Sequence, residues 1–134
     1  MFKRLDDRIF VTGQIGPGDL AEVKALGVTM IVNNRPDGEE PGQPLSAQIE
    51  AATLAAGLGY RHIPVAGGFS ADQVEAMAAA LAEANGRTLA FCRSGTRSTY
   101  LWALAEASRG RDGEELIECA AVAGYDLMPI AHLL

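Results

Sequence analysis

Short apolar runs alternate with amphipathic stretches along this chain, and that alternation indicates an α/β domain with a largely parallel sheet. The clearest run covers residues 28–32, where every residue except Thr29 is apolar. A run without polar alternation is typical of a strand that is covered on both faces. We expect further strands at residues 9–12, 60–65 and 88–91.

Amphipathic stretches follow these strands, and several carry the end signals of helices. Ser70 and Gln73 fit a capping box, in which the serine hydroxyl accepts from an exposed amide and the glutamine reaches back. Gly27 stands where a C-terminal glycine ends a helix. No repeat, low-complexity tract or linker divides the chain, so residues 1–134 are expected to form a single domain. The expected helices cover residues 19–26, 46–56, 70–84, the stretch from the loop after residue 92 to residue 109, 114–123 and 126–133.

The composition argues against several classes of partner. The chain has a net charge of −6, and an acidic surface repels nucleic acid and anionic membranes. An anionic ligand would therefore have to be captured by a local positive site. No window approaches the roughly 20 apolar residues that span a bilayer, and the N-terminus turns acidic at Asp6 and Asp7, where a signal peptide would turn apolar. We expect a cytoplasmic protein that binds neither nucleic acid nor membrane.

The segment from residue 92 to residue 98, Cys-Arg-Ser-Gly-Thr-Arg-Ser, joins the last expected strand to a long helix. Amides at a helix N-terminus lack internal acceptors, and the helix dipole turns its positive end toward them. Successive amides can therefore converge on one anion, and Gly95 lets the backbone bend. The Arg97 guanidinium adds a planar fork of donors. The residues of this predicted anion-binding loop are Arg93, Ser94, Gly95, Thr96 and Arg97.

The same surroundings make Cys92 a candidate nucleophile, because a helix N-terminus beside arginine favours the thiolate form. The Ser98 hydroxyl is placed to donate to that sulfur or to a leaving thiolate. Cys119 lies in an Ala-rich stretch and is expected in the core, with a resolving thiol for Cys92 as the alternative. No spacing of His, Cys, Asp and Glu suggests a metal site, and we expect no cofactor.

The loop resembles those of two families of cysteine enzymes. Cys-Arg-Ser-Gly-Xaa-Arg-Ser is similar to the active loop of rhodanese sulfurtransferases, whose cysteine carries a persulfide and passes sulfur to a thiophilic acceptor. It also resembles the cysteine-phosphatase signature His-Cys-Xaa-Xaa-Gly-Xaa-Xaa-Arg-Ser/Thr, whose cysteine attacks phosphorus and forms a phosphocysteine.

Most of the chain resembles the phosphatases. Three segments follow one another in the order found in dual-specificity phosphatases. They are Arg-Ile-Phe-Val-Thr-Gly-Gln from Arg8, Leu-Gly-Val-Thr-Met-Ile-Val-Asn-Asn-Arg-Pro-Asp-Gly from Leu26, and Tyr-Arg-His-Ile-Pro-Val from Tyr60. They look especially like a family of small bacterial phosphatase-like domains, some of them fused to metallo-β-lactamase-like hydrolases. The resemblance extends to Ala-Gly-Tyr-Asp-Leu at residue 123. It implies a three-layer cysteine-phosphatase-like fold, with a mostly parallel sheet of four to five strands flanked by helices.

The chain departs from the phosphatase pattern in three places. Phe91 stands where phosphatases usually place a histidine, and the stretch from Cys92 to Arg97 is one residue shorter than the phosphatase loop and equals the rhodanese length. The loop at residues 66–70 lacks the aspartate that serves these enzymes as general acid. Asp72 follows it, but that position in a capped helix is expected to stabilise the helix dipole.

The acid that a phosphatase needs is therefore sought in the loop after residue 32. Ligands of open α/β sheets bind beyond the carboxyl ends of the strands, so this loop is expected to face Cys92. We expect Asp37 to be the acid, with Glu39 and Glu40 as alternatives, and Arg35 to add a second cation to the anion site.

Three functions stay open at this point. The first is a phosphatase-like hydrolase with Cys92 as nucleophile, Arg97 and the loop amides as anion cradle, Ser98 assisting the thiolate and Asp37 as acid. The second is a sulfurtransferase with a Cys92 persulfide, which needs no such acid. The third is an anion-binding module without turnover. The expected substrate is a small anion, either a phosphate ester or a sulfane-sulfur donor.

Overall fold

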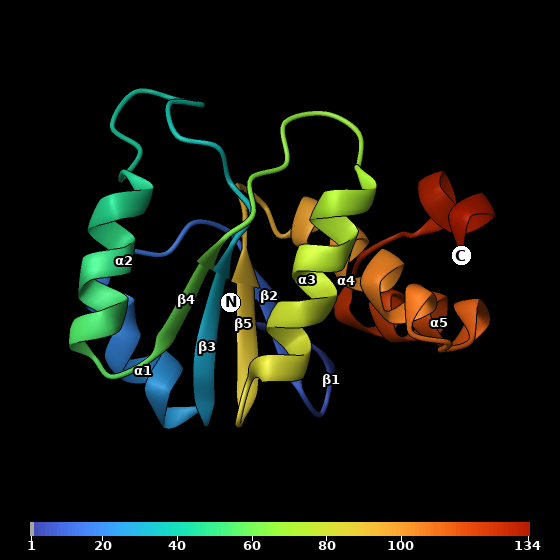
Figure 1. Cartoon of the computed structure of the whole chain (residues 1–134), viewed down its shortest axis with the longest axis horizontal. Coiled ribbons are helices and arrows are strands. Elements are labelled where there is room, and N and C mark those ends of the chain that lie inside the picture. The colour runs from blue at the N-terminus through green and yellow to red at the C-terminus, as the bar shows by residue number, and fades with distance from the viewer. Residues whose placement is uncertain (1) are drawn as a thin grey trace.

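A five-stranded sheet with the order β1-β2-β5-β3-β4 forms the centre of the protein in the computed structural model, which describes residues 2–134 (Figure 1). The strands β2, β5, β3 and β4 run parallel, and β1 pairs with β2 in the antiparallel sense. This confirms the predicted mostly parallel sheet of four to five strands. The strands are β1 (Lys3–Asp6), β2 (Ile9–Thr12), β3 (Val28–Asn33), β4 (Gly59–His62) and β5 (Arg87–Phe91).

Helices cover both faces of this sheet. Figure 1 shows α1 and α2 on one face and α3, α4 and α5 on the other, which is the three-layer arrangement that was expected. None of the helices within residues 2–134 is long and apolar enough to cross a lipid bilayer. The helical elements are η1 (Pro17–Asp19), α1 (Leu20–Ala25), α2 (Ser46–Ala55), α3 (Ala71–Glu83), α4 (Thr96–Ser108), α5 (Gly113–Ala123) and η2 (Met128–Leu133).

The strand β3, which lies between β5 and β4, separates two apolar cores. Ile31 and Val32 are each 0 % exposed, and their side chains belong to different cores because successive residues of a strand point to opposite faces. Ile31 packs with residues of α1 and α2, whereas Val32 packs with residues of α3, α4 and α5. The prediction of a strand covered on both faces is confirmed. Burial of one such side chain stabilises the fold by about 1.5–3 kcal/mol.

Three elements differ from their predicted form. The strand β1 was not predicted because only Leu5 of its residues is buried, so it carries no apolar run. The strand expected to reach residue 65 ends at His62, because the amides of Ile63 and Val65 donate to the adjacent carbonyls of Asn33 and Asn34, whereas a ladder uses every second carbonyl. The last segment is a 3-10 helix over Met128–Leu133 and not an α-helix.

The capping box predicted before α3 is present. Ser70 Oγ accepts a hydrogen bond from the Gln73 amide at 3.1 Å, and the Ser70 amide donates to Gln73 Oε1 at 2.7 Å. Gln73 Nε2 also donates to the carbonyl of Pro64 at 2.9 Å. One glutamine therefore begins the helix and ties down the loop that leads from β4 into it.

Candidate active site

Three loops meet at the carboxyl edge of the parallel strands. The loop of residues 92–95 leads from β5 into α4, the loop of residues 34–45 leads from β3 to α2, and the loop of residues 63–70 leads from β4 to α3 (Figure 1). Parallel strands end at the same edge of a sheet, so residues far apart in the sequence are brought together there. This is the edge at which the candidate residues were expected.

Cys92 lies at the bottom of the first loop and is 0 % exposed. The amide of Gly95 donates a hydrogen bond to Cys92 Sγ at 3.1 Å. Gly95 has a φ of +91° and is the N-cap of α4, so it occupies the left-handed region that glycine adopts without strain. A Cβ at this position would also lie 2.2 Å from the Tyr125 hydroxyl. The turn that directs an amide at the sulfur therefore depends on glycine.

The remaining amides of the loop supply further donors. Those of Arg93, Ser94, Thr96 and Arg97 have no hydrogen-bond acceptor within the described part of the chain. They lie at the positive end of α4, a helix of 13 residues, where an anion is stabilised by the helix dipole. Unpaired amides in this setting are what an anion nest requires. Anion binding by this loop stays a prediction.

The side chain of Arg97 is held by Glu39. Arg97 Nη1 lies 2.7 Å from Glu39 Oε2, and Nη2 lies 2.8 Å from Oε1, which makes a bidentate pair. Nη1 also donates to the carbonyl of Val65 at 2.6 Å. Hydrogen bonding to Glu39 raises the pKa of Arg97, and the neighbouring Cys92 sulfur acts in the same direction. The guanidinium thus lies close to both the sulfur and a carboxylate.

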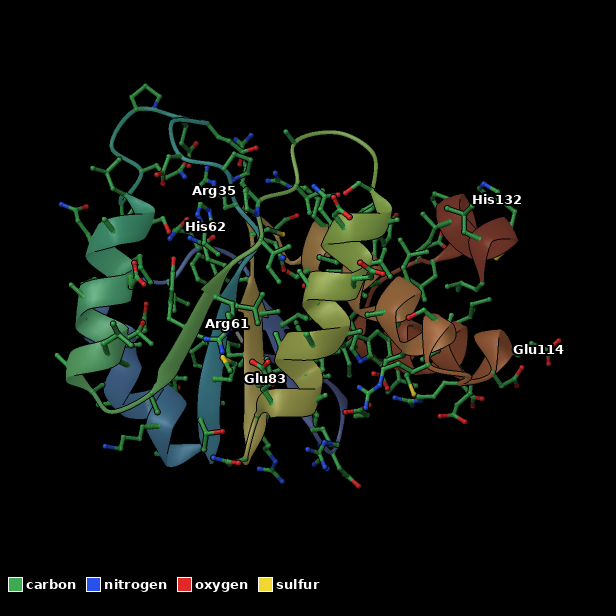
Figure 2. All side chains as sticks on the ribbon, in the orientation of Figure 1. Arg35, Arg61, His62, Glu83, Glu114 and His132 are labelled. Atoms are coloured by element: carbon green, nitrogen blue, oxygen red, sulfur yellow. The ribbon has the colours of Figure 1, made fainter. Side chains whose placement is uncertain are left out.

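Behind Glu39 lies Arg35, which is only 1 % exposed. Its Nε donates to Glu39 Oε1 at 3.0 Å and its Nη1 donates to Gln14 Oε1 at 3.0 Å. Its Nη2 lies 3.0 Å from Glu40 Oε1 but lacks the alignment of a hydrogen bond. Burial opposes the charge, yet the neighbouring carboxylates of Glu40 and Glu39 outweigh it and raise the pKa of Arg35. Figure 2 shows Arg35 beside His62, whose Nε2 lies 2.9 Å from the Arg35 carbonyl oxygen.

The two arginines hold Glu39 in its charged form. Hydrogen bonds from Arg97 and, more weakly, from Arg35 lower the pKa of Glu39, although partial burial acts against them. Arg35 therefore does not add a second cation to an open anion site, as the sequence had suggested. It anchors the carboxylate that covers Arg97. An ionised carboxylate accepts hydrogen bonds and has no proton to donate.

Asp37 lies near the start of α2, and its role as the general acid stays a prediction. Its Oδ1 accepts a hydrogen bond from the Ser46 amide at 2.8 Å, where it satisfies an unpaired amide at the start of α2. Two other carboxylates of this segment reach side chains of the cysteine loop: Glu39 pairs with Arg97, and Glu40 lies 3.6 Å from Arg93. Asp72 lies in the first turn of α3, as expected from its place in the capped helix.

Ser98 also differs from its predicted role. Its hydroxyl is buried and donates to Asn34 Oδ1 at 2.8 Å, and a serine has a single hydroxyl proton to give. Asn34 Nδ2 in turn donates to the carbonyl of Ile63 at 2.9 Å. Ser98 therefore connects α4 with the ends of β3 and β4 and does not donate to the sulfur. Asn34 was missed because nothing near it in the sequence indicates a partner 64 residues away.

The exposed residues of the loop make weaker contacts. Arg93 is 67 % exposed in its side chain, and its Nη2 lies 3.6 Å from Glu40 Oε2. The hydroxyls of Ser94 and Thr96 lie 3.1 Å apart. Within residues 2–134 no three His, Cys, Asp or Glu side chains gather in an arrangement that would hold a metal ion.

Cys119 belongs to the other end of the molecule. It packs against the core of α3, α4 and α5, and burial raises the pKa of its thiol. The charges that act on it are those of Arg111, Asp6, Glu115 and Glu118. Asp6 ends the strand that pairs with the amino end of β2, whereas Cys92 follows the carboxyl end of β5. Cys119 is therefore not placed to resolve an oxidised Cys92.

Comparison with known proteins gives a consistent set of relatives. A family described as beta-lactamase hydrolase-like protein, phosphatase-like domain, matches residues 1–109. The beta-lactamase hydrolase-like protein of Agrobacterium fabrum is 38 % identical over 126 residues, which are 92 % of this chain and 29 % of that protein. The chain thus spans less than a third of the length of such curated relatives.

Solved structures agree with this result. A candidate phosphatase from Neisseria meningitidis is 33 % identical, with a TM-score of 0.84 over 98 % of this chain and 94 % of the other. The kinase associated phosphatase, solved with its catalytic cysteine replaced by serine, is 17 % identical, with a TM-score of 0.67 over 87 % of this chain and 75 % of the other. The fold is that of the cysteine phosphatases, as the sequence resemblance implied.

Proposed function

Because this chain belongs to the family of phosphatase-like domains of beta-lactamase hydrolase-like proteins, we propose that it is a cysteine-dependent phosphatase acting on a small phosphomonoester. The family and the fold identify a phosphatase-like hydrolase; the nucleophile and the intermediate are our inference. The observation that carries it is the Gly95 amide, which donates to Cys92 Sγ at 3.1 Å at the N-terminus of α4. A donor aimed at the sulfur stabilises a thiolate.

The proposed reaction has two steps. The Cys92 thiolate attacks phosphorus, so that an S–P bond forms while the ester P–O bond breaks and its electron pair leaves with the oxygen. Water then attacks the phosphocysteine, the S–P bond breaks, and inorganic phosphate and the thiolate are released. The unpaired amides of Arg93, Ser94, Thr96 and Arg97 are proposed to hold the phosphoryl oxygens, because the transition state spreads negative charge over them.

The substrate has to displace Glu39 from Arg97. The bidentate pair occupies the two guanidinium nitrogens that would bind a phosphoryl group in the same way. Displacement is feasible because the pair is partly exposed, with side-chain exposures of 23 % for Arg97 and 27 % for Glu39. A solvent-exposed ion pair contributes about 0–1 kcal/mol, and a bidentate pair such as this one lies toward the upper end of that range.

The surroundings of Cys92 favour aryl esters among phosphomonoesters. Glu39 is held ionised, Asp37 is engaged at α2, and the loop of residues 66–70 contains no carboxyl group. An alkoxide leaving group needs a proton from such an acid. A phenolate, whose conjugate acid has a pKa of about 10, leaves with less assistance. We therefore propose an aryl phosphate as the substrate class.

A sulfurtransferase is the second candidate, and the length of the loop favours it. The stretch from Cys92 to Arg97 has the rhodanese length, and sulfur transfer requires no acid of the phosphatase kind. Attack of Cys92 on the outer sulfur of thiosulfate would break the S–S bond, release sulfite and leave a persulfide. Cyanide would then remove that sulfur as thiocyanate. The match over most of the chain to phosphatase-like proteins ranks this function second.

The two candidates are separated by activity assays on three proteins: wild type, Cys92→Ser and the control Cys119→Ser. We expect wild type and Cys119→Ser to hydrolyse an aryl phosphate, with competitive inhibition by vanadate. Cys92→Ser should lose at least about 10³-fold in kcat, because the nucleophile is removed. Conversion of thiosulfate and cyanide to thiocyanate by wild type, without aryl phosphate hydrolysis, would replace the phosphatase with the sulfurtransferase. A protein that binds phosphate and does neither would be an anion-binding module.

A further inference from the structure

We propose that Tyr125 is a positioning residue that keeps the Cys92 loop in its anion-binding conformation by fixing one peptide group. This inference rests on the proposed role of Cys92 as the nucleophile. Tyr125 lies beyond α5, 31 residues along the chain from Ser94, and no local sequence pattern indicates a contact between them.

One peptide group carries the argument. The Tyr125 hydroxyl donates to the carbonyl oxygen of Ser94 at 3.1 Å, and the amide of the same peptide, that of Gly95, donates to Cys92 Sγ at 3.1 Å. The C=O and N–H of a trans peptide point in opposite directions. A donor placed on the carbonyl side therefore ensures that the amide faces the sulfur. The chain of two hydrogen bonds also polarises the peptide in the direction that stabilises a thiolate.

The Ser94–Gly95 peptide needs the hydrogen bond from Tyr125 because glycine leaves the peptide free to rotate. Gly95 at a φ of +91° has no Cβ to restrict the backbone, so the flipped peptide is accessible to the loop in isolation. The flipped form would lose both hydrogen bonds and turn the carbonyl oxygen toward the thiolate. The Tyr125 hydroxyl also fills the space of the missing Cβ, because a Cβ there would lie only 2.2 Å from it.

Tyr125 is itself held in place. The preceding Gly124 ends α5 at a φ of +97°, and the Tyr125 amide donates to the carbonyl of Ala120 at 2.8 Å. The ring packs against the same core as the buried Leu127, which follows it. Burial, together with the charge on Cys92, raises the pKa of the Tyr125 hydroxyl, so it remains a protonated donor near neutral pH.

The test is Tyr125→Phe, which keeps the ring and removes the donor. Tyr100→Phe is the matched control, since the Tyr100 hydroxyl has no hydrogen-bond partner within residues 2–134. Two quantities are measured in wild type and both variants: kcat/KM for an aryl phosphate, and the rate at which iodoacetate alkylates Cys92 as a function of pH. Thermal unfolding is recorded to verify that each variant is folded.

We expect Tyr125→Phe to lower kcat/KM by about 2- to 10-fold and to move the midpoint of alkylation to a higher pH by about 0.4–1 pH unit, the effect of one net hydrogen bond. Tyr100→Phe should match wild type in both. An alkylation profile that coincides with wild type in folded Tyr125→Phe would overturn the inference, since a structural role alone would not move it.

The alkylation measurement separates this inference from the proposed function. Iodoacetate reports the thiolate whether or not the protein hydrolyses phosphate esters. A wild type without phosphatase activity, combined with a shifted profile in Tyr125→Phe, would remove the proposed function and support the role of Tyr125. An active wild type, combined with an unshifted alkylation profile in Tyr125→Phe, would support the proposed function and overturn the role of Tyr125.

Discussion

At the scale of single residues, the pairing of Arg97 with Glu39 determines the state of the site. The guanidinium that would bind an oxyanion already binds a carboxylate at 2.7 and 2.8 Å. The buried Arg35 contacts the same carboxylate, because its Nε donates to Glu39 Oε1 at 3.0 Å. A phosphate ester therefore competes with an internal anion, and its affinity depends on how firmly Glu39 is held.

The first prediction concerns the substitution Glu39→Gln. It removes the competing charge, so we expect vanadate or phosphate to bind about 3- to 10-fold more tightly, a change of about 1 kcal/mol. Isothermal titration calorimetry measures this affinity directly. Glu83→Gln is the matched control, because its partner Arg61 lies on β4 away from the cysteine loop (Figure 2). Weaker anion binding in Glu39→Gln would mean that Glu39 orients Arg97 for the substrate.

The second prediction is the pH dependence of stability that follows from Glu39. Arg97 and Arg35 lower its pKa in the folded protein, so the ion pair stabilises the fold fully above the unfolded value of about 4.3 and is lost as the pH falls through the lower folded value. Between about pH 5 and about pH 3 the free energy of unfolding of Glu39→Gln should fall by about 1 kcal/mol less than that of wild type. Urea unfolding at each pH measures the free energy of unfolding of both proteins. If the free energy of unfolding depended on pH in the same way in both proteins, the proposed contribution of the Glu39 ion pair would be contradicted.

At the scale of elements, buried hydrogen bonds align α4 with the sheet. Ser98 donates to Asn34 at 2.8 Å, and Asn34 donates to Ile63 at 2.9 Å. The helix that carries the loop amides is thereby fixed to the ends of β3 and β4. Because the contact positions the whole helix, its loss should reduce stability more than it changes the chemistry of the sulfur.

The third prediction separates these two effects with Ser98→Ala. The change leaves Asn34 Oδ1 buried without a donor, which costs about 1–3 kcal/mol of unfolding free energy. The rate at which iodoacetate alkylates Cys92 should keep its pH profile. Ser108→Ala is the control on the same helix, since its hydroxyl donates only to a carbonyl of that helix. A shifted alkylation profile without loss of stability would restore the role predicted from the sequence, donation to the thiolate.

Most elements were predictable because their patterns are local. The apolar run at residues 28–32 predicts a strand that is covered on both faces. The order of strand, glycine and helix around Gly95 predicts the anion-binding loop. The choice among Asp37, Glu39 and Glu40 was not predictable, because it depends on how a loop with Gly38 at a φ of +77° folds back. Long-range partners such as Asn34 and Tyr125 leave no local signal at all.

At the scale of the whole molecule, the fold gathers positive charge at one edge of an acidic protein. The net charge is −6, yet Arg35, Arg93 and Arg97 lie around the cysteine loop at the carboxyl edge of the sheet. Glu39 and Glu40 neutralise much of that charge in the absence of a ligand. Local capture of an anion, and not attraction by the protein's overall field, is therefore the mode of binding that this architecture supports.

The central claim is that the Cys92 thiolate carries the reaction through phosphorus. Intact-mass spectrometry tests it on wild type and Cys92→Ser, each incubated without reductant with an aryl phosphate and quenched in acid, and separately with thiosulfate. We expect one phosphoryl group on wild type, none on Cys92→Ser, and no mass change with thiosulfate. One added sulfur on wild type alone, removable by cyanide and accompanied by no phosphorylated species, would contradict the claim and make sulfur transfer the primary function.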